Sequence, residues 1–311
     1  MRILVTGGTG FVGRAVLRTL VAANHTPRLA VRTAHAGLPA DAVCVGDIGP
    51  STDWSRALEG IDAVVHLAAR VHVMRDHAGG REEFVRTNTE GTLRLARAAA
   101  AAGARRFVFV STVKVNGEST TSRPFAADDP PAPTDPYAES KLAAELGLRE
   151  IDGLHPVIVR PPLIHGPGVK GNLERLCRLA RSGMPVPFAA IDNRRDLVGV
   201  ENLASLIECC VTHLDAPGQV FLASDGCALS TPELYRIIAE ALGRPARMFR
   251  VPVSLMRVLA RPFGLSAELN RLTQSLELDI GKTRTVLGWE PKLSAAAGIR
   301  AMALAANAGI T

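Results

Sequence analysis

Three glycines near the N-terminus restrict the possible folds of this chain more than any other feature. Gly7 and Gly10 follow the strand-like segment 2–6, and Gly13 lies at the start of the helix-like segment 11–24. A tight turn with close backbone approach leaves no room for a Cβ atom at such positions. The spacing therefore predicts that the chain begins with a strand, a glycine-rich turn and a helix. The free N–H groups at the start of that helix are suited to the pyrophosphate of a dinucleotide.

Short β-branched runs alternate with helix-like segments through the first half of the chain. The expected strands cover 2–6, 27–32, 42–46, 61–67, 106–111 and 156–160, and the expected helices cover 11–24, 53–60, 88–103 and 136–150. This alternation predicts an α/β fold with a doubly wound parallel sheet of the Rossmann type. We expect residues 1–165 to form an NAD(P)-binding Rossmann domain. Residues 166–311 are expected to form a smaller, partly interleaved substrate-binding lobe that is too rich in loops for a second independent core.

Composition excludes several other classes of protein. Hydrophobic residues make up 47% and charged residues 21%, which is ordinary for a globular protein. The net charge of +6 is spread along the chain without a basic run, so we expect an anionic small molecule and no nucleic acid as partner. No apolar run of membrane-spanning length and no signal peptide is seen, which predicts a cytoplasmic protein without membrane contact. The five cysteines form no CxxC pair, so buried free thiols and no metal site are expected.

The end of the second expected strand bears on the choice of cofactor. An NAD-preferring protein usually carries an Asp or Glu there, whereas this chain has Ala30, Val31 and Arg32. A guanidinium can receive the 2′-phosphate of NADP in a bidentate manner. NADP(H) is therefore favoured, and NAD(H) is possible.

A tyrosine and a lysine lie four residues apart in the segment 135–145. Asp135 can cap a helix and Pro136 can occupy its first turn, so Tyr137 and Lys141 share one helix face. A nearby ammonium group is expected to lower the pKa of the phenol toward the range in which it exchanges protons at neutral pH. The pair is typical of alcohol/ketone interconversion.

These motifs together resemble one known family. The order and spacing of the extended short-chain dehydrogenases/reductases, the NAD(P)-dependent nucleotide-sugar epimerase/dehydratase family, are kept by TGGTGFVG at 6–13, GDI at 46–48, LAA at 67–69, NTEGT at 88–92, ST at 111–112, YAESK at 137–141 and RPP at 160–162. The resemblance implies an acid/base role for Tyr137, a hydroxyl on the reacting sugar oxygen from Thr112 or alternatively Ser111, and contact of Lys141 with the nicotinamide ribose. It also implies a cofactor site formed by Gly7, Gly10, Phe11, Val12, Gly13, Arg32, Asp47, Ile48, Leu67, Ala68, Ala69, Asn88, Tyr137, Lys141 and Pro161.

Segments after residue 165 resemble those that hold the substrate in nucleotide-sugar epimerases. The resemblance implies that Asn172 and Arg195 bind the nucleoside diphosphate of a UDP-sugar, with Arg195 on the phosphates. His72 is a candidate for contact with the sugar, as is Lys114. Members of this family frequently dimerise through the helices that contain NTEGT and the Tyr-Lys pair, so a homodimer is expected.

The sequence leaves the reaction open between related alternatives. Thr112 is followed by Val113 and Lys114 rather than the acidic pair of sugar 4,6-dehydratases, which disfavours dehydration. Asn116 and Gly117 replace the Tyr-Gly common in 4-epimerases, and LAARVHVMRD resembles the branch that reduces UDP-4-keto-(amino)sugars for surface polysaccharides. NAD(P)H-dependent 4-reduction is therefore preferred, and a UDP-hexose or UDP-N-acetylhexosamine 4-epimerase is the alternative. A catalytically inactive NADP(H)-binding sensor is disfavoured because both members of the Tyr-Lys pair are present.

Overall fold

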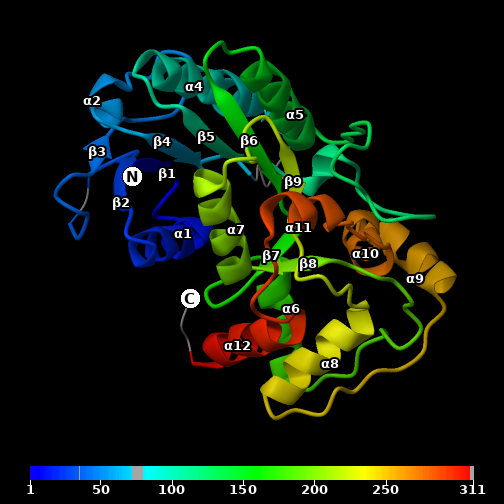
Figure 1. Cartoon of the computed structure of the whole chain (residues 1–311). Helices are drawn as coiled ribbons and strands as arrows, with labels where there is room; N and C mark the ends of the chain where they lie inside the picture. Colours follow the sequence, from blue (N-terminus) through cyan, green and yellow to red (C-terminus); the bar gives the residue numbers. More distant parts are fainter. Residues whose placement is uncertain (35, 72–79, 309–311) are drawn as a thin grey trace.

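A seven-stranded parallel sheet forms the centre of the protein (Figure 1). The computed structural model describes residues 1–34, 36–71 and 80–308. The strands follow the order β3-β2-β1-β4-β5-β6-β9, and every neighbouring pair is parallel. Their bounds are β1 Arg2–Thr6, β2 Thr26–Val31, β3 Val43–Cys44, β4 Ala63–His66, β5 Arg106–Val110, β6 His155–Arg160 and β9 Val220–Leu222. The first six lie where the sequence predicts strands.

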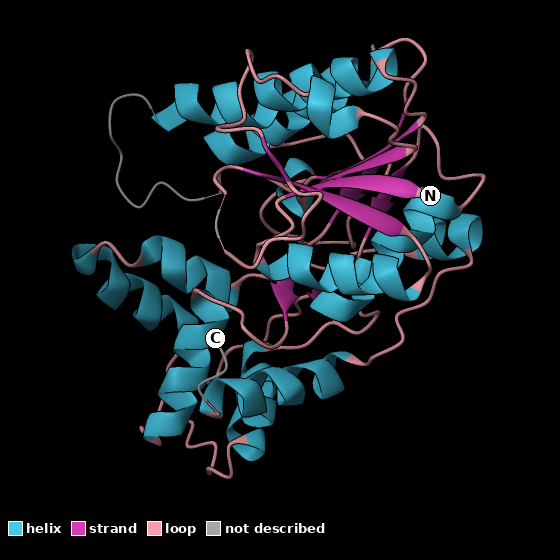
Figure 2. Ribbon diagram, turned by 90° about the vertical axis from the view of Figure 1, so that its left-hand side faces the viewer, coloured by secondary structure: helices cyan, strands magenta, loops and turns pink. Residues whose placement is uncertain are grey.

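Continuous apolar runs explain why this sheet is buried on both faces. Ile3, Leu4 and Val5 of β1 are fully buried, as parallel strands between two helical layers require. Helices α4 and α5 cover one face, and α1 and α7 cover the other, so the sheet lies between two layers (Figure 2). The flanking helices are α1 Phe11–Ala22, α2 Ser55–Leu58, α3 Gly80–Phe84, the π-helix η1 Val85–Gly91, α4 Thr92–Ala101, α5 Pro136–Arg149 and α7 Val200–Thr212.

The remaining elements lie outside the sheet, and most of them build a lobe below it in Figure 1. They are the 3-10 helix η2 Val113–Val115, the two-stranded sheet of β7 Leu163–His165 and β8 Leu197–Gly199, and the helices α6 Asn172–Ser182, α8 Thr231–Ala241, α9 Val253–Ala260, η3 Arg261–Phe263, α10 Ser266–Thr273, α11 Gly281–Leu287 and α12 Ala295–Asn307. Of these, η2 follows β5 directly and α11 packs near β9 at the sheet.

The lobe has an apolar core of its own, contrary to the expectation from sequence. Phe188, Tyr235, Ile238 and Ile299 belong to a buried cluster separate from the one around the sheet. The expectation was wrong because α8 and α12 carry apolar residues at helical spacing that pair across the intervening loops. The sheet's cluster also takes in residues of α7 and β9, so residues beyond 166 contribute to both cores. We propose these two clusters as the cores of two interleaved lobes.

The cysteines only partly follow the expectation of buried thiols. Cys177 and Cys210 are buried and Cys209 is half-buried, but Cys44 and Cys227 are exposed. All five are free thiols. Over residues 1–34, 36–71 and 80–308, no group of His, Cys, Asp and Glu could hold a metal ion. In the same ranges, no helix is both long enough and apolar enough to span a bilayer.

Candidate active site

The glycine-rich turn at the carboxyl end of β1 packs so closely that side chains are excluded. A Cβ atom on Gly13 would lie 2.2 Å from the carbonyl oxygen of Gly7, and one on Gly7 would lie 2.8 Å from the amide nitrogen of Ala68. Gly7 also has a φ of 70°. Gly10 caps α1 with extended backbone, and no side chain accepts a hydrogen bond from the first turn. The start of α1 therefore presents N–H groups toward the carboxyl edge of the sheet, and it fits the pyrophosphate of a dinucleotide.

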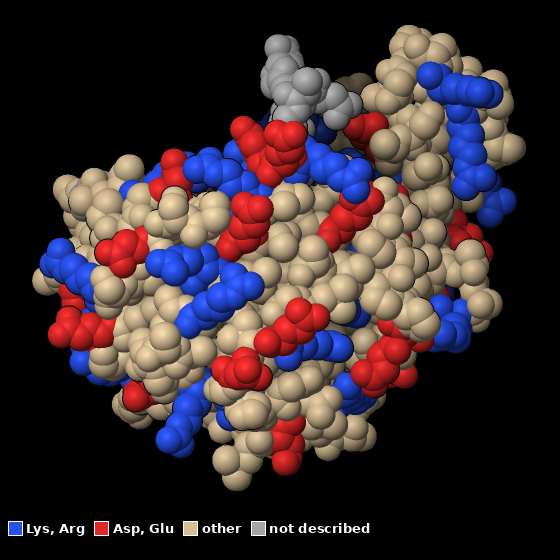
Figure 3. Space-filling model, turned by 90° about the horizontal axis from the view of Figure 1, so that it is seen from above, with Lys and Arg blue, Asp and Glu red and all other residues tan. Residues whose placement is uncertain are grey.

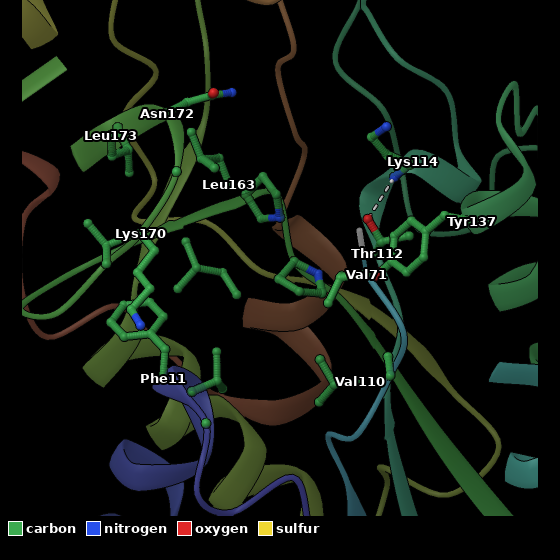
Figure 4. Close-up of a pocket in the computed structure, with 18 of the residues that line it drawn as sticks. Phe11, Val71, Val110, Thr112, Lys114, Tyr137, Leu163, Lys170, Asn172 and Leu173 are labelled. Carbon is green, nitrogen blue, oxygen red and sulfur yellow. Dashed lines mark hydrogen bonds between the residues drawn. The ribbon is translucent and has the colours of Figure 1, made fainter. Parts of the chain in front are cut away.

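One cavity of about 2070 Å³ runs from this turn across the edge of the sheet into the lower lobe. It brings together eighteen of the candidate site residues singled out from sequence. These are Gly7, Gly10, Phe11, Val12, Gly13, Arg32, Asp47, Ile48, Leu67, Ala68, Ala69, Ser111, Thr112, Lys114, Tyr137, Pro161, Asn172 and Arg195. Figure 4 shows Thr112, Lys114 and Tyr137 on one wall and Phe11, Lys170 and Asn172 on the other.

Two hydroxyl groups lie where β5 ends at the cavity. The Oγ atom of Ser111 is buried and has no hydrogen-bond partner. The Oγ1 atom of Thr112 accepts a hydrogen bond from the amide of Lys114 at 3.3 Å, which leaves its own O–H proton available. Both hydroxyls can therefore donate to an oxygen atom in the cavity.

Tyr137 reaches the same part of the cavity from the first turn of α5. Asp135 caps this helix by accepting a hydrogen bond from the amide of Ala138 at 2.7 Å, as predicted. The Tyr137 ring packs edge-on against Phe84, with ring centroids 6.1 Å apart. Burial, and secondarily the negative charge of Asp135, raise the pKa of the Tyr137 phenol. The direction is opposite to the one expected from sequence, so in this structure Tyr137 is a proton donor at neutral pH.

Lys141 lies behind Tyr137 rather than on the cavity wall. Its Nζ atom donates a hydrogen bond to the carbonyl of Val110 at 2.8 Å and lies 3.9 Å from the centre of the Phe109 ring. Burial lowers the pKa of Lys141 to about 7, and the charge of Glu145 opposes this effect. The prediction that the ammonium lowers the pKa of the phenol was therefore wrong for this structure. The amine lies in the core and supports the end of β5.

Asn88 also lies away from the cavity wall, and its expected contact with the cofactor stays a prediction. Its amide group donates to the carbonyl of Arg70 at 3.1 Å and to the hydroxyl of Ser140 at 3.0 Å. Its carbonyl oxygen accepts from the amide of Arg70 at 2.8 Å. These bonds use most of its hydrogen-bonding capacity, because an amide side chain has two N–H donors and one carbonyl acceptor. Asn88 therefore ties the cavity-lining loop after β4 to helix α5.

Two carboxylates hold the Lys114 side chain at the reacting end of the cavity. Its amine forms an ion pair with Asp135 and a longer one with Glu118 at 3.4 Å. Asp135 thus caps α5 and also holds Lys114 beside Thr112. His72, the other candidate for sugar contact, lies outside the described residues.

At the adenosine end, Arg32 and Asp47 face each other. The Nε atom of Arg32 lies 2.9 Å from a carboxylate oxygen of Asp47, and both side chains are about three-quarters exposed. The guanidinium proposed to receive a 2′-phosphate therefore has an anionic partner in this structure. The basis for an NADP preference is correspondingly weaker.

Arginines of the lower lobe line the far part of the cavity, and Arg195 and Arg271 among them form no ion pair with a carboxylate of the described residues. Arg195 lines this end and donates to the carbonyl of Gln274 at 2.9 Å. Burial, and then the positive charge of Arg271, lower the pKa of Arg195. Arg271 comes from α10 and lines the same cavity. Two neighbouring cations that form no ion pair within the described part of the chain fit the two negative charges of a diphosphate.

Arg271 was missed from sequence, and Asp196 has a structural role beside Arg195. No motif surrounds Arg271, and only the packing of α10 over the cavity brings it to Arg195. Asp196 is buried and accepts hydrogen bonds from the hydroxyl of Ser224 and, at 2.8 Å, from the amide of Leu278. It therefore holds the chain that positions Arg195 and does not face the cavity.

The fold and the cavity together place the protein among the short-chain dehydrogenases/reductases of the extended type. The model of the NAD dependent epimerase/dehydratase family matches residues 3–223. The chain belongs to that family, and it is an enzyme of the family.

Comparisons with individual proteins agree with this assignment. A "UDP-glucose 4-epimerase" of Vibrio cholerae is 41% identical over 312 residues, which cover 97% of this chain and 94% of the relative. The structure of UDP-glucuronic acid 4-epimerase from Bacillus cereus in complex with NAD is similar with a TM-score of 0.79, 21% identity and full coverage of both chains. The structure of RMD from Pseudomonas aeruginosa complexed with NADPH has a TM-score of 0.75, 23% identity and 99% coverage of both chains. At these identities the two structures support the fold alone.

Proposed function

We propose that this protein is an NAD-dependent UDP-sugar 4-epimerase. One observation carries the proposal: a single cavity connects the glycine-rich turn, the hydroxyls beside Tyr137 and the paired arginines. A nucleotide sugar anchored at Arg195 and Arg271 can extend its hexose to the wall formed by Thr112 and Tyr137. The Vibrio cholerae relative at 41% identity has this activity in its name.

The residues of the cavity suit proton transfer at the C4 oxygen of the sugar. When bound, the dinucleotide supplies the acceptor and donor of hydride. Tyr137 exchanges a proton with the C4 oxygen, and Thr112 or Ser111 donates a hydrogen bond to the same oxygen. Lys141 acts on this chemistry from the core by fixing the end of β5, through the carbonyl of Val110.

Asn116, one of the two residues that disfavour a 4-epimerase in the sequence, does not line the cavity. Asn116, which replaces the family's tyrosine, is buried, and its carbonyl oxygen accepts from the guanidinium of Arg160 at 3.0 Å. Its amide nitrogen donates to the carbonyl of Ala126 at 3.0 Å. The side chain therefore serves the packing behind the site and does not enter the cavity.

A 4-ketoreductase is the second candidate, and the state of Tyr137 favours it. An ordinary phenol is already protonated at neutral pH, and burial raises the pKa of Tyr137 further above that pH. A protonated phenol is ready to donate to a 4-keto oxygen, whereas epimerisation begins with removal of a proton from the C4 hydroxyl. The same groups would then run only the reducing half of the epimerase reaction.

We propose NAD(H) as the cofactor, because Asp47 neutralises Arg32 beside the expected position of the ribose. A 2′-phosphate would gain one cation but would also meet a carboxylate.

Two variants test this choice of cofactor. Arg32→Ala is expected to leave activity with NAD(H) within threefold. Asp47→Asn, which frees the guanidinium, is expected to improve use of NADP(H) at least tenfold, measured as kcat/KM for each cofactor. Unchanged cofactor selectivity in Asp47→Asn would contradict this assignment.

The reaction itself is tested by following both sugar and cofactor. The purified protein is incubated with UDP-glucose or UDP-N-acetylglucosamine and substoichiometric NAD, and the 4-epimers are separated by chromatography. Conversion of one epimer into the other beyond the amount of NAD supports the epimerase. Stoichiometric loss of NADH or NADPH with a UDP-4-keto sugar, together with no epimer formation, supports the reductase. Absence of both activities, in a protein that binds NAD, contradicts both proposals.

We also propose a homodimer through α4 and α5, with UDP-sugar as the substrate of each copy. Leu146 on α5 is half-exposed, which leaves an apolar side chain on that face. Sedimentation velocity is expected to show a dimer that Leu146→Lys weakens. A monomeric wild-type protein would exclude the dimer.

A further inference from the structure

The segment 249–265, here called the α9 surface, leaves an unusual amount of apolar side chain in contact with solvent. Six of the sixteen exposed large hydrophobic residues among the described parts of the chain fall within it. Val258 is 69% exposed, Leu259 58% and Phe263 76%. None of the eight residues of α9 is buried. A contiguous exposed patch of this kind is typical of an interaction site rather than of ordinary surface.

The apolar side chains of α9 gather on its outer face. Leu255, Val258 and Leu259 are spaced three and four residues apart, so they lie together on one side of the helix. Val253 and Met256 lie outside this face and pack against the second core. The turn η3 then adds Phe263 next to the outer face. The protein thus presents an apolar ridge that is exposed in the described part of the fold.

Arginines surround this ridge without carboxylates to balance them. Arg250, Arg257 and Arg261 lie within the α9 surface, and Arg244 and Arg247 come just before it. All five are exposed, and none forms an ion pair among the described residues. Residues 244–267 contain no Asp or Glu. In Figure 3 the part of the molecule that projects at the upper right is mainly tan, with blue side chains along it.

The α9 surface lies next to the substrate end of the cavity. Helix α9 packs against α10, and α10 contributes Asn270 and Arg271 to the cavity wall. Figure 1 places both helices at the edge of the molecule, away from the seven-stranded sheet. A partner bound to α9 would therefore lie beside the arginines proposed to hold the diphosphate.

We propose that the α9 surface docks on an anionic lipid bilayer. An apolar ridge flanked by arginines matches the boundary between acyl chains and negatively charged headgroups. A second copy of this chain fits less well, because an isologous dimer would place the same arginines against each other. Helix α9 has eight residues, so it would lie in the interface and not cross the bilayer. The contact differs from the sequence expectation of no membrane partner.

Vesicle flotation with the full chain tests the proposal. Vesicles of phosphatidylcholine alone are compared with vesicles that contain about 30% phosphatidylglycerol, at low and at physiological salt. We expect binding to the anionic vesicles that weakens as salt screens the arginines. Each arginine near the surface contributes on the order of fivefold in partitioning. Arg257→Gln combined with Arg261→Gln is therefore expected to lower binding roughly 25-fold, and Phe263→Ser is expected to weaken it at all salt concentrations.

Two control variants separate the α9 surface from general stickiness. Leu214→Ser removes an 86% exposed apolar side chain elsewhere, and Arg178→Gln removes an exposed arginine of α6. Both are expected to bind vesicles like the wild type, and all variants are expected to retain solution activity. No binding to anionic vesicles, or equal losses in the control variants, overturns the proposal. Concentration-dependent dimerisation that Phe263→Ser abolishes, without vesicle binding, assigns the surface to a second copy and also overturns it.

Discussion

The hydroxyl groups around the reacting end of the cavity differ in what each already bonds. Ser111 has an unpartnered Oγ atom, Thr112 accepts one hydrogen bond, and Tyr137 is held protonated by burial. A group that carries out proton transfer contributes about 10²–10⁴-fold to the rate. Tyr137→Phe is therefore expected to lower kcat by at least about 10²-fold while the affinity for the dinucleotide changes less than threefold. The affinity for the dinucleotide is measured by fluorescence titration. Unchanged turnover would remove Tyr137 from the mechanism and favour a non-catalytic, cofactor-binding protein.

Ser111 and Thr112 can be separated because only one of them contributes a hydrogen bond to the fold. Ser111→Ala removes a hydroxyl that bonds nothing in the protein, so the melting temperature is expected to stay the same or rise slightly. Thr112→Val loses both the acceptor for the Lys114 amide and the hydroxyl that donates to the sugar oxygen. Thr112→Ser keeps both. We expect kcat to fall about 100-fold in Thr112→Val and less than threefold in Thr112→Ser. A larger loss in Ser111→Ala than in Thr112→Val would transfer the hydroxyl role to Ser111.

Between elements, a buried ion pair fixes α5 against β6. Arg160 and Glu145 have side chains 4% and 1% exposed, and their closest contact is 2.5 Å. Arg160 also donates to Asn116 at 3.0 Å, which ties in the turn after β5. Breaking a buried pair costs about 3–5 kcal/mol because it leaves an uncompensated charge. Glu145→Gln is expected to lower the free energy of unfolding in urea by this amount.

A surface pair provides the comparison for Glu145. Glu174 and Arg178 lie 2.8 Å apart on α6 with side chains 37% and 63% exposed. Exposed pairs contribute about 0–1 kcal/mol. Glu174→Gln is therefore expected to change the free energy of unfolding by less than about 1 kcal/mol. Similar losses in the free energy of unfolding in both variants would show that burial does not make the Arg160–Glu145 pair more important for stability than an exposed pair.

His66 links β4 to its neighbours and makes the fold sensitive to acid. Its Nδ1 atom lies 2.7 Å from the hydroxyl of Thr6, and its Nε2 atom lies 3.0 Å from that of Thr92. Burial, and then the charge of Lys141, lower the pKa of His66 to about 3. The unfolded chain, with a pKa of 6.5 at this residue, therefore binds more protons than the fold between pH 6.5 and pH 3. The stabilisation from neutral His66 is present above pH 6.5 and is lost as the pH falls.

The size of this effect follows from the pH interval. Each pH unit below 6.5 costs about 1.4 kcal/mol, so acidification from pH 7 to pH 5 is expected to remove about 2 kcal/mol through His66. Other groups titrate as well, and the measurement is therefore the difference between wild type and His66→Gln in urea unfolding at both pH values. The variant is expected to lose about 2 kcal/mol less than the wild type over this interval. Equal losses in the free energy of unfolding of wild type and variant would mean that His66 becomes protonated in the folded protein over this interval.

Local motifs could be predicted from sequence, and contacts made by packing could not. The glycine-rich turn and the Asp135 cap depend on residues close together in the chain, and both were predicted. Lys141 was placed on the correct helix face, but how far its amine withdraws depends on Phe109 and Val110, which no pattern near residue 141 encodes. Arg271 reaches the cavity only through the fold of the lower lobe. The second core was missed for the same reason, because α8 and α12 meet across a long stretch of chain.

At the scale of the whole molecule, the cavity connects two lobes that offer different groups to an anion. The sheet provides helix N–H groups at one end, and the lower lobe provides Arg195 and Arg271 at the other. A hydrogen bond to a charged group contributes about 1.5–3 kcal/mol. Arg271→Ala is therefore expected to raise the Kd for UDP about 10- to 100-fold in calorimetry, and Arg195→Ala to raise it at least as much. The affinity for the dinucleotide should not change, because the glycine-rich turn lies at the opposite end.

The double variant tests whether the two arginines share one ligand. Each guanidinium repels the other, which is why Arg271 contributes to the lowered pKa of Arg195. Removing one relieves this repulsion, so the loss of UDP affinity in the double variant is expected to be smaller than the product of the single losses. Arg178→Ala, which removes an exposed arginine of α6, should leave the Kd for UDP unchanged. Single losses that multiply fully would mean that the two cations bind separate groups, and an unchanged Kd in both single variants would place the diphosphate elsewhere.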